Sequence, residues 1–204
     1  MHKIPTKTVQ KLRRWFRKEM RVLPWRATRE IYPIWLSEVM LQQTTVETVK
    51  SRFASFIERF PTLSDLANAS EQDVLHQWQG LGYYSRARNL HRAAKTIVSK
   101  YGEEPPADAD FWTALPGVGR YIVGAVLAQA FEQKLPIVEA NTRRLWARFL
   151  AIAKILNPQP QKNGFGRLQR KFCQKSRSVN SIRPVWSWEH SSACQKIPLA
   201  LDAH

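Results

Sequence analysis

Apolar residues recur at intervals of three or four along most of the first 156 residues, and no segment alternates apolar and polar residues over a sustained stretch. This spacing places apolar side chains on one face of a helix, whereas alternation would indicate a strand. The sequence therefore predicts an all-α fold. The first helix has an apolar stripe made of Val9, Leu12, Phe16 and Met20. Further helices are predicted over residues 32–43, 46–60, 84–101 and 121–131, and another is predicted to begin near Ala140. Ser70 is predicted to be a helix N-cap, because acidic residues follow it in what would be the first turn.

The chain carries 32 Lys and Arg against 16 Asp and Glu, a formal net charge of +16. Such an excess favours a polyanion partner, usually nucleic acid, because cationic side chains neutralise phosphates and release counterions. No apolar run approaches the roughly 20 residues of a membrane helix, so we expect no membrane partner. The basic N-terminal segment lacks the apolar core of a secretory signal, and we expect a cytoplasmic location. The two cysteines, Cys173 and Cys194, predict neither a disulfide framework nor a metal site.

The sequence LPGVGR, residues 115–120, lies between two predicted helices. Its glycines, Gly117 and Gly119, allow the turn to approach a ligand closely and leave N–H groups exposed at a helix N-terminus. That geometry suits a DNA phosphate, and Arg120 adds positive charge. The alternative is an ordinary turn between helices, but the preceding Leu-Pro and the following helix of small apolar residues are typical of helix-hairpin-helix DNA-binding proteins.

The sequence GLGYYSRARNL, residues 80–90, combines a glycine-flanked turn with two tyrosines and two arginines. Exposed aromatic residues beside basic ones can stack on bases or separate them, which makes Tyr83 and Arg86 candidates for DNA contact. The alternative is that the tyrosines fill a core and the arginines are solvated.

Glu38 stands among apolar residues in the sequence SEVMLQQT. On a helix, Ile34 lies one turn before it and Leu41 one turn after it. We expect partial burial to raise the pKa of this carboxyl toward the range of a general acid. Gln42 and Gln43 follow and could occupy the place of a displaced base. The alternative is a structural ion pair between Glu38 and an arginine.

A second acid, Glu139, precedes the last predicted helix in the sequence PIVEANTRR. Two carboxylates can divide the work of breaking a glycosidic bond, since one protonates the leaving group and the other stabilises the cationic sugar.

Six motifs occur in order between about residue 5 and about residue 155, namely LPWR, YPIWLSEVMLQQT, TLSDLANA, WQGLGYYSRARNLHRAA, LPGVGRYIVGAV and PIVEANTRRLWAR. Together they resemble the MutY-type adenine DNA glycosylases of the helix-hairpin-helix superfamily. The resemblance implies a monomer that acts on double-stranded DNA, in a bacterial nucleoid, where adenine is mispaired with 8-oxoguanine or guanine. It also implies a domain layout of residues 1–22 (N-terminal helix of a second helical domain), 23–133 (six-helix domain with the hairpin), 134–156 (remainder of the second domain) and 157–204 (divergent tail).

The resemblance implies a catalytic role for four residues. Glu38 takes the position of the acid that protonates adenine, Glu139 that of an aspartate that stabilises the sugar cation, and Tyr121 and Asn141 those of supporting residues. The residues implied to contact DNA or the displaced base are Arg26, Leu41, Gln42, Gln43, Tyr83, Arg86, Gly117, Gly119 and Arg120. Arg26 would lie beside the displaced adenine, and Gln42 and Tyr83 would enter the base stack.

The residue at position 121 distinguishes two reaction types within the superfamily, base removal with strand cleavage and base removal alone. Endonuclease III-like relatives have a lysine after this turn, and its amine attacks the sugar and permits strand cleavage. A tyrosine there predicts base removal without cleavage. Two alternatives stay open, a bifunctional glycosylase/lyase and a catalytically silent DNA-binding relic.

The sequence departs from the resemblance in two places. Glu139 is one methylene longer than the aspartate of the family, and a shift of about 1 Å in a catalytic group can cost on the order of a hundredfold in rate. The tail offers two cysteines where the family's [4Fe-4S] cluster needs four, so no cofactor is expected. Alternative codons for residues 181–191 give a family-like segment, and we expect a frameshift near residues 156–165.

Overall fold

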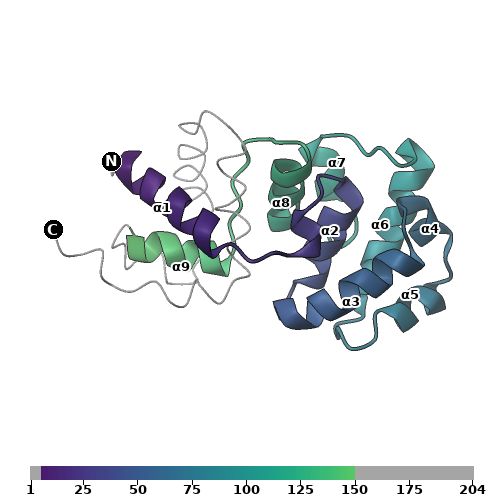
Figure 1. Cartoon of the computed structure of the whole chain (residues 1–204). Coiled ribbons are helices and arrows are strands. Elements are labelled where there is room, and N and C mark those ends of the chain that lie inside the picture. The colour runs from purple at the N-terminus through teal and green to yellow at the C-terminus, as the bar shows by residue number, and fades with distance from the viewer. Residues whose placement is uncertain (1–5, 150–204) are drawn as a thin grey trace. The chain divides into compact units, whose positions relative to one another are not determined.

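The computed structural model describes residues 6–149, and every regular element in this part of the chain is helical (Figure 1), which confirms the all-α prediction. The first and last of these elements are α1 (Thr6–Glu19) and α9 (Ala140–Phe149). The predictions about residues 150–204, including Cys173, Cys194 and the frameshift, lie outside the described residues. None of the helices in the described part of the chain is both long and apolar enough to span a membrane.

The chain divides into two compact units. One unit is Val22–Gln133, and the described residues 6–21 and 134–149 belong to the other. The first unit contains η1 (Pro24–Arg26), α2 (Ile31–Met40), α3 (Val46–Arg59), α4 (Leu63–Asn68), α5 (Glu71–Gln77), α6 (Ser85–Tyr101), α7 (Ala109–Ala114) and α8 (Arg120–Ala130). Two of its α-helices, α4 and α7, are short, with six residues each.

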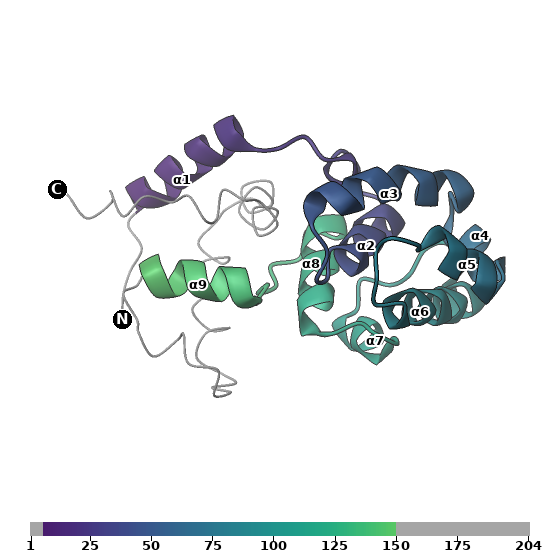
Figure 2. The ribbon, with the colours of Figure 1, turned by 90° about the horizontal axis from the view of Figure 1, so that it is seen from below.

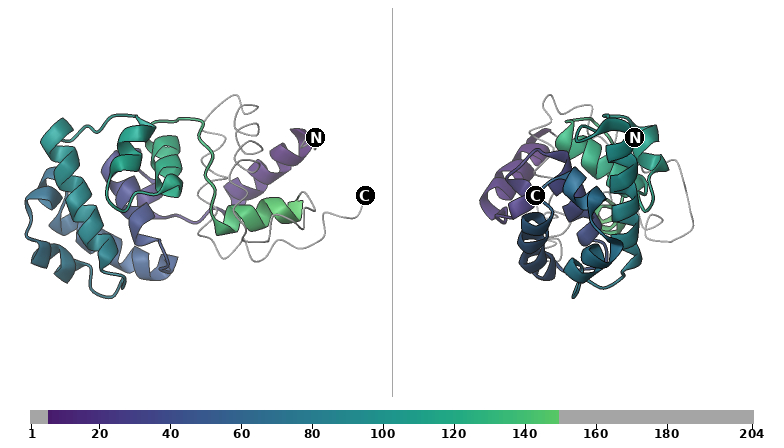
Figure 3. Two further views of the ribbon diagram at one scale, coloured as in Figure 1. Left: turned by 180° about the vertical axis from the view of Figure 1, so that it is seen from behind. Right: turned by 90° about the vertical axis from the view of Figure 1, so that its right-hand side faces the viewer.

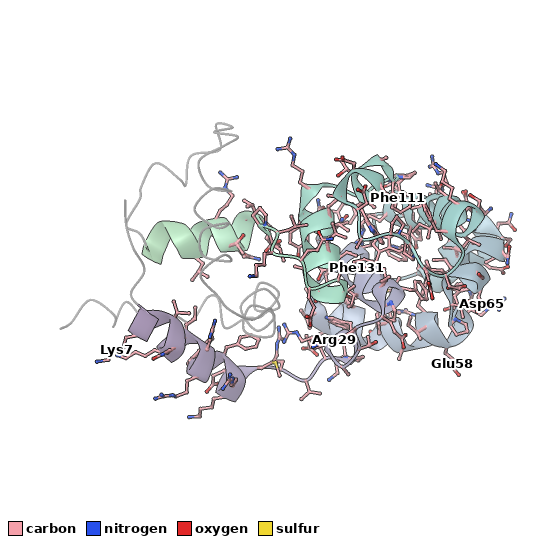
Figure 4. All side chains as sticks on the ribbon, turned by 90° about the horizontal axis from the view of Figure 1, so that it is seen from above. Lys7, Arg29, Glu58, Asp65, Phe111 and Phe131 are labelled. Atoms are coloured by element: carbon pink, nitrogen blue, oxygen red, sulfur yellow. The ribbon has the colours of Figure 1, made fainter. Side chains whose placement is uncertain are left out.

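The core of the Val22–Gln133 unit is built around α2 and α8, which pack against each other (Figure 2). Both helices are buried on nearly all sides, as expected for segments that are apolar all round. Three tryptophans, Trp35, Trp78 and Trp112, are fully buried. The longest helix, α6, packs against α4 and α5 (Figure 3). Side chains fill the space between these helices, whereas the exposed Glu58 and Asp65 lie at the edge of the unit (Figure 4).

Side-chain caps fix where several helices begin. Thr62 and Asp65 form a capping box at α4, and the hydroxyl of Ser70 accepts a hydrogen bond from the backbone N–H of Asp73 at α5. The second of these confirms the cap predicted at Ser70. Each such cap satisfies an N–H group that the helix leaves without a partner.

Two predicted helices end earlier than expected. The helix expected over residues 32–43 stops at Met40, because its last carbonyl groups accept hydrogen bonds from the side chain of Arg86 and because Gln43 adopts a left-handed backbone with φ of 55°. The first helix ends at Glu19, so Met20 lies beyond it and is 47% exposed. Phe16 of the predicted stripe is buried, at 3% exposure.

Candidate functional site

The carboxylate of Glu38 lies inside the Val22–Gln133 unit, where only 5% of the residue is exposed. Its Oε2 atom accepts a hydrogen bond from the hydroxyl of Tyr121 at 2.7 Å, and its Oε1 atom accepts one from Nε2 of Gln129 at 2.8 Å. Burial disfavours an ionised carboxylate, whereas donors aimed at its oxygens favour it. The two donors therefore offset part of the cost of burial and fix the orientation of the carboxyl group.

The sequence of α8 explains how both donors reach the same acid. Tyr121, Ala125 and Gln129 are four residues apart, which places them along one side of the helix. Small residues at 124, 125 and 128 let the backbone of α8 come close to α2. Since Glu38 is on α2, its short distance to Tyr121 and Gln129 follows from the packing of these two helices.

In the turn between α7 and α8, backbone conformation and packing require glycine at position 117. Gly117 has φ of +74°, and a Cβ atom there would lie 2.8 Å from Cβ of Asn89. Gly119, by contrast, has φ of −85° and no neighbouring atom within 4 Å of a Cβ. Gly119 is the N-cap of α8 and provides no side-chain cap, so packing within the described residues does not require glycine there.

Glu139 and Asn141 contact each other at the start of α9. Nδ2 of Asn141 donates to Oε1 of Glu139 at 2.9 Å. The backbone N–H of Glu139 donates to the hydroxyl of Thr142 at 2.8 Å, and the Glu139 carbonyl accepts the N–H of Arg143. Glu139 thus precedes α9 in a fixed conformation, with its half-buried carboxylate held by Asn141.

Two turns of the Val22–Gln133 unit carry the residues predicted to enter the base stack. Gln42 is half-buried and Gln43 is exposed, and both follow α2. Tyr83, which precedes α6, is 61% exposed and has φ of 47°. Non-glycine residues at positive φ are uncommon outside functional sites and strained turns.

Two residues predicted to contact DNA face inward instead. Leu41 is 4% exposed and packs in the core. Arg86 is 9% exposed, and its guanidinium donates to main-chain oxygens of its own unit. Burial lowers the pKa of Arg86 from its usual value, and the nearby Tyr83 opposes that shift. Both assignments as DNA contacts are corrected here, because neither side chain is presented at the surface.

The remaining predicted contacts lie at or near the surface. Arg26 is half-buried at the end of η1, and Arg120 is exposed at the first position of α8. Their roles toward DNA stay predictions.

Comparison with known proteins identifies the family of this chain. A family profile described as "HhH-GPD superfamily base excision DNA repair protein" matches residues 36–168. The chain belongs to the HhH-GPD superfamily. The region matched begins within α2 and continues through α9, and so contains Glu38, both of its donors and the turn at residues 115–120.

Within the HhH-GPD superfamily, the chain is similar to proteins named adenine DNA glycosylase. It is 43% identical to that of Rattus norvegicus over 147 residues, which cover 68% of this chain and 28% of the relative. It is 40% identical to that of Buchnera aphidicola subsp. Schizaphis graminum over 130 residues, or 64% of this chain and 38% of the relative. The chain thus matches well under half of the length of either relative.

Solved structures of DNA glycosylases share the fold. A thermostable thymine-DNA glycosylase superposes with a TM-score of 0.79 at 23% identity, covering 90% of this chain and 84% of that one. Endonuclease III in a non-covalent complex with DNA gives a TM-score of 0.69 at 17% identity, covering 91% of this chain and 86% of that one.

The expectation that this chain holds no [4Fe-4S] cluster stays a prediction. Four cysteine thiolates hold such a cluster, and the sequence has Cys173 and Cys194 alone. In the described residues, no group of three or more His, Cys, Asp or Glu side chains could hold a metal ion.

Sequence reasoning missed Gln129 as part of the Glu38 cluster. The available signal was its spacing of eight residues, about two helical turns, from Tyr121, which places a polar side chain on the otherwise apolar buried face of α8. A buried polar side chain in such a place needs a partner, and the partner is Glu38.

We predict that Gln129→Met lowers the free energy of unfolding by about 1–3 kcal/mol, because it keeps the volume of the side chain but removes one hydrogen-bond donor from a buried carboxylate. Urea titration measures the change. Gln72→Met, at an exposed position on α5, is the control and should change stability by no more than about 0.5 kcal/mol. Equal stability of the Gln129 variant and the wild type would contradict the assigned contact.

The two glycines of the 115–120 turn should respond in different ways. Gly117→Ala should destabilise the fold, since it combines a strained φ with a contact to Asn89. Gly119→Ser should leave the melting temperature unchanged or raise it, because serine is a favourable N-cap residue. Differential scanning calorimetry separates the two outcomes. A large fall in the melting temperature of the Gly119 variant would contradict the finding that a Cβ atom at this position has no close neighbour.

Proposed function

We propose that this protein is an adenine DNA glycosylase of base excision repair that acts where adenine is mispaired with 8-oxoguanine or guanine in double-stranded DNA. The identity of 43% and 40% to proteins of that name supports the activity. The observation that carries the proposal is the buried Glu38 carboxyl, held by Tyr121 and Gln129. A carboxyl group in that setting is suited to donate a proton where water is largely excluded.

DNA binding would begin at the turn between α7 and α8. The N-cap residue of α8, Gly119, provides no side-chain cap for the first-turn N–H groups, and a Cβ atom at this position would have no neighbour within 4 Å. Such N–H groups and the partial positive charge of a helix N-terminus attract a phosphate. Arg120, which is exposed beside them, adds a full positive charge.

The adenine must leave the base stack before it can reach a buried acid. Tyr83, with 61% of its surface exposed, and Gln42 would enter the stack as the base leaves it. Arg26 would lie beside the displaced adenine.

The reaction would proceed by transfer of the Glu38 proton to a ring nitrogen of adenine. The bond between C1′ and the base then breaks, and its electron pair leaves with adenine, so that the sugar becomes an oxocarbenium-like cation. The carboxylate of Glu139, oriented by Asn141, would stabilise that cation. Water adds its oxygen to C1′, and its released proton returns to Glu38.

Tyr121 bears on whether strand cleavage follows base removal. Its hydroxyl donates to Glu38, and a phenol at this position supplies no amine to form a covalent adduct with the sugar. We therefore assign it a supporting role and assign the protein monofunctional activity.

A single-turnover assay on duplexes with adenine opposite 8-oxoguanine tests the proposal. Glu38→Gln should lower the rate of base loss by at least about a hundredfold, since general acid catalysis contributes roughly 10²–10⁴. Glu58→Gln, which changes an exposed glutamate on α3, should leave the rate unchanged. Binding of the duplex by the wild type with no loss of adenine would instead support the DNA-binding relic.

Borohydride treatment during the reaction tests the monofunctional assignment. We expect abasic DNA and no covalent protein–DNA product, because Tyr121 cannot form a Schiff base. A trapped adduct at full stoichiometry would support a glycosylase/lyase.

A further inference from the structure

The side chain of Arg86 links two separate turns of the Val22–Gln133 unit. It begins on the first turn of α6, is 9% exposed, and has hydrogen-bond acceptors 2.5–3.1 Å from its two terminal nitrogens. The acceptors of Nη1 are the carbonyl oxygens of Val39, Met40 and Gln42. Those of Nη2 are the hydroxyl of Thr44 and the carbonyl oxygens of Leu81 and Gly82.

These acceptors fall into two groups along the chain. One group belongs to residues 39–44, where α2 ends, and the other to residues 81–82, just before α6. One guanidinium therefore contacts both segments at once. The hydroxyl of Thr44 adds a second connection, since it also donates to the carbonyl of Leu81 at 3.3 Å.

Each of the two segments has a non-glycine residue in the left-handed region of backbone conformation. Gln43 has φ of 55° and Tyr83 has φ of 47°. Such conformations persist only where surrounding contacts impose them. Each residue directly follows one whose carbonyl accepts a bond from Arg86, namely Gln42 and Gly82.

Aromatic rings complete the surroundings of Arg86. Its guanidinium carbon lies 5.4 Å from the ring centre of Trp78 and 5.6 Å from that of Tyr83. Trp78 is fully buried and donates from its indole nitrogen to the carbonyl of Gly82 at 3.1 Å. The exposed ring of Tyr83 thus rests on a cation that is itself fixed on a buried tryptophan.

We propose that Arg86 is a positioning residue that joins the 41–44 turn to the 81–84 turn, so that Gln42 and Tyr83 are presented to DNA as one rigid wedge. The part of this inference that concerns DNA rests on the proposed function. The joining of the two turns rests on the contacts alone. Lysine could not replace arginine here, because its single ammonium group cannot reach acceptors on two segments with a planar fork.

Hydrogen exchange in the protein without DNA tests the joining of the turns. In the first turn, the amides of Gln42 and Thr44 donate to the carbonyls of Val39 and Leu41, and in the second turn the amide of Leu81 donates to the carbonyl of Trp78. In Arg86→Lys, all three should exchange at least tenfold faster, while amides in the middle of α3 should keep the rates of the wild type. Acceleration in one turn only, or in neither, would overturn the proposal.

A loss of overall stability could also raise exchange rates, so the control must lower stability elsewhere. Ile97 is fully buried on α6, about three turns from Arg86. Ile97→Val and Ile97→Ala should bracket the loss of stability in the Arg86 variant. Neither should accelerate the two turns selectively, and selective acceleration in either would overturn the proposal.

Thr44→Val provides a milder test if Arg86→Lys fails to fold, since it removes one acceptor of Arg86 and the bond to Leu81. It should accelerate exchange in both turns, by less than Arg86→Lys. An effect confined to the 41–44 turn would overturn the proposal.

The consequence for DNA is tested by the fluorescence of 2-aminopurine placed opposite 8-oxoguanine, which rises when the base leaves the stack. Arg86→Lys should lose at least five-sixths of the rise seen with the wild type at saturating protein, whereas Ile97→Val should retain it. Full retention by Arg86→Lys would overturn the wedge. If the wild type itself gives no rise, the proposed function fails, while the exchange experiment still decides whether Arg86 joins the turns.

Discussion

The contact between α2 and α8 is the interaction on which the rest of the account depends. It takes a carboxylate into the interior of the Val22–Gln133 unit and supplies two neutral donors, Tyr121 and Gln129, from one side of one helix. A buried acid without partners would destabilise the fold. With these partners it is tolerated, and the same contacts that make it tolerable also fix the direction in which it can transfer a proton.

In the Val22–Gln133 unit, the proposed catalytic acid and the residues proposed to contact DNA lie on different kinds of structural element. Glu38 lies on a buried helix, whereas Tyr83, Gln43 and Gly119 lie on turns. The turns are not loose, since a buried arginine bonds to two of them and Gly117 packs tightly against Asn89 in the third. In this unit, buried polar contacts therefore determine how the exposed residues are presented.

The sequence allowed the helices to be predicted wherever periodicity and caps agree, as at Ser70 and over α3. It failed where a contact between distant segments decides the structure. The end of α2 depends on Arg86, which is 46 residues from Met40. The sequence makes the same arginine a candidate for DNA contact because exposed aromatic residues beside basic ones are typical of such contacts, and only the packing shows that its acceptors are internal. The pairing of Glu139 with Asn141 is local and could be anticipated, whereas that of Gln129 with Glu38 spans 91 residues and was not.

The protonation state of Glu38 in the DNA complex tests the central claim most directly. It can be measured from the ¹³C chemical shift of its carboxyl carbon, with the protein bound to a duplex that places a non-hydrolysable adenosine analogue opposite 8-oxoguanine. The account predicts a protonated carboxyl at pH 7. An ionised carboxylate that titrates near the ordinary glutamate value of about 4.3 would contradict it.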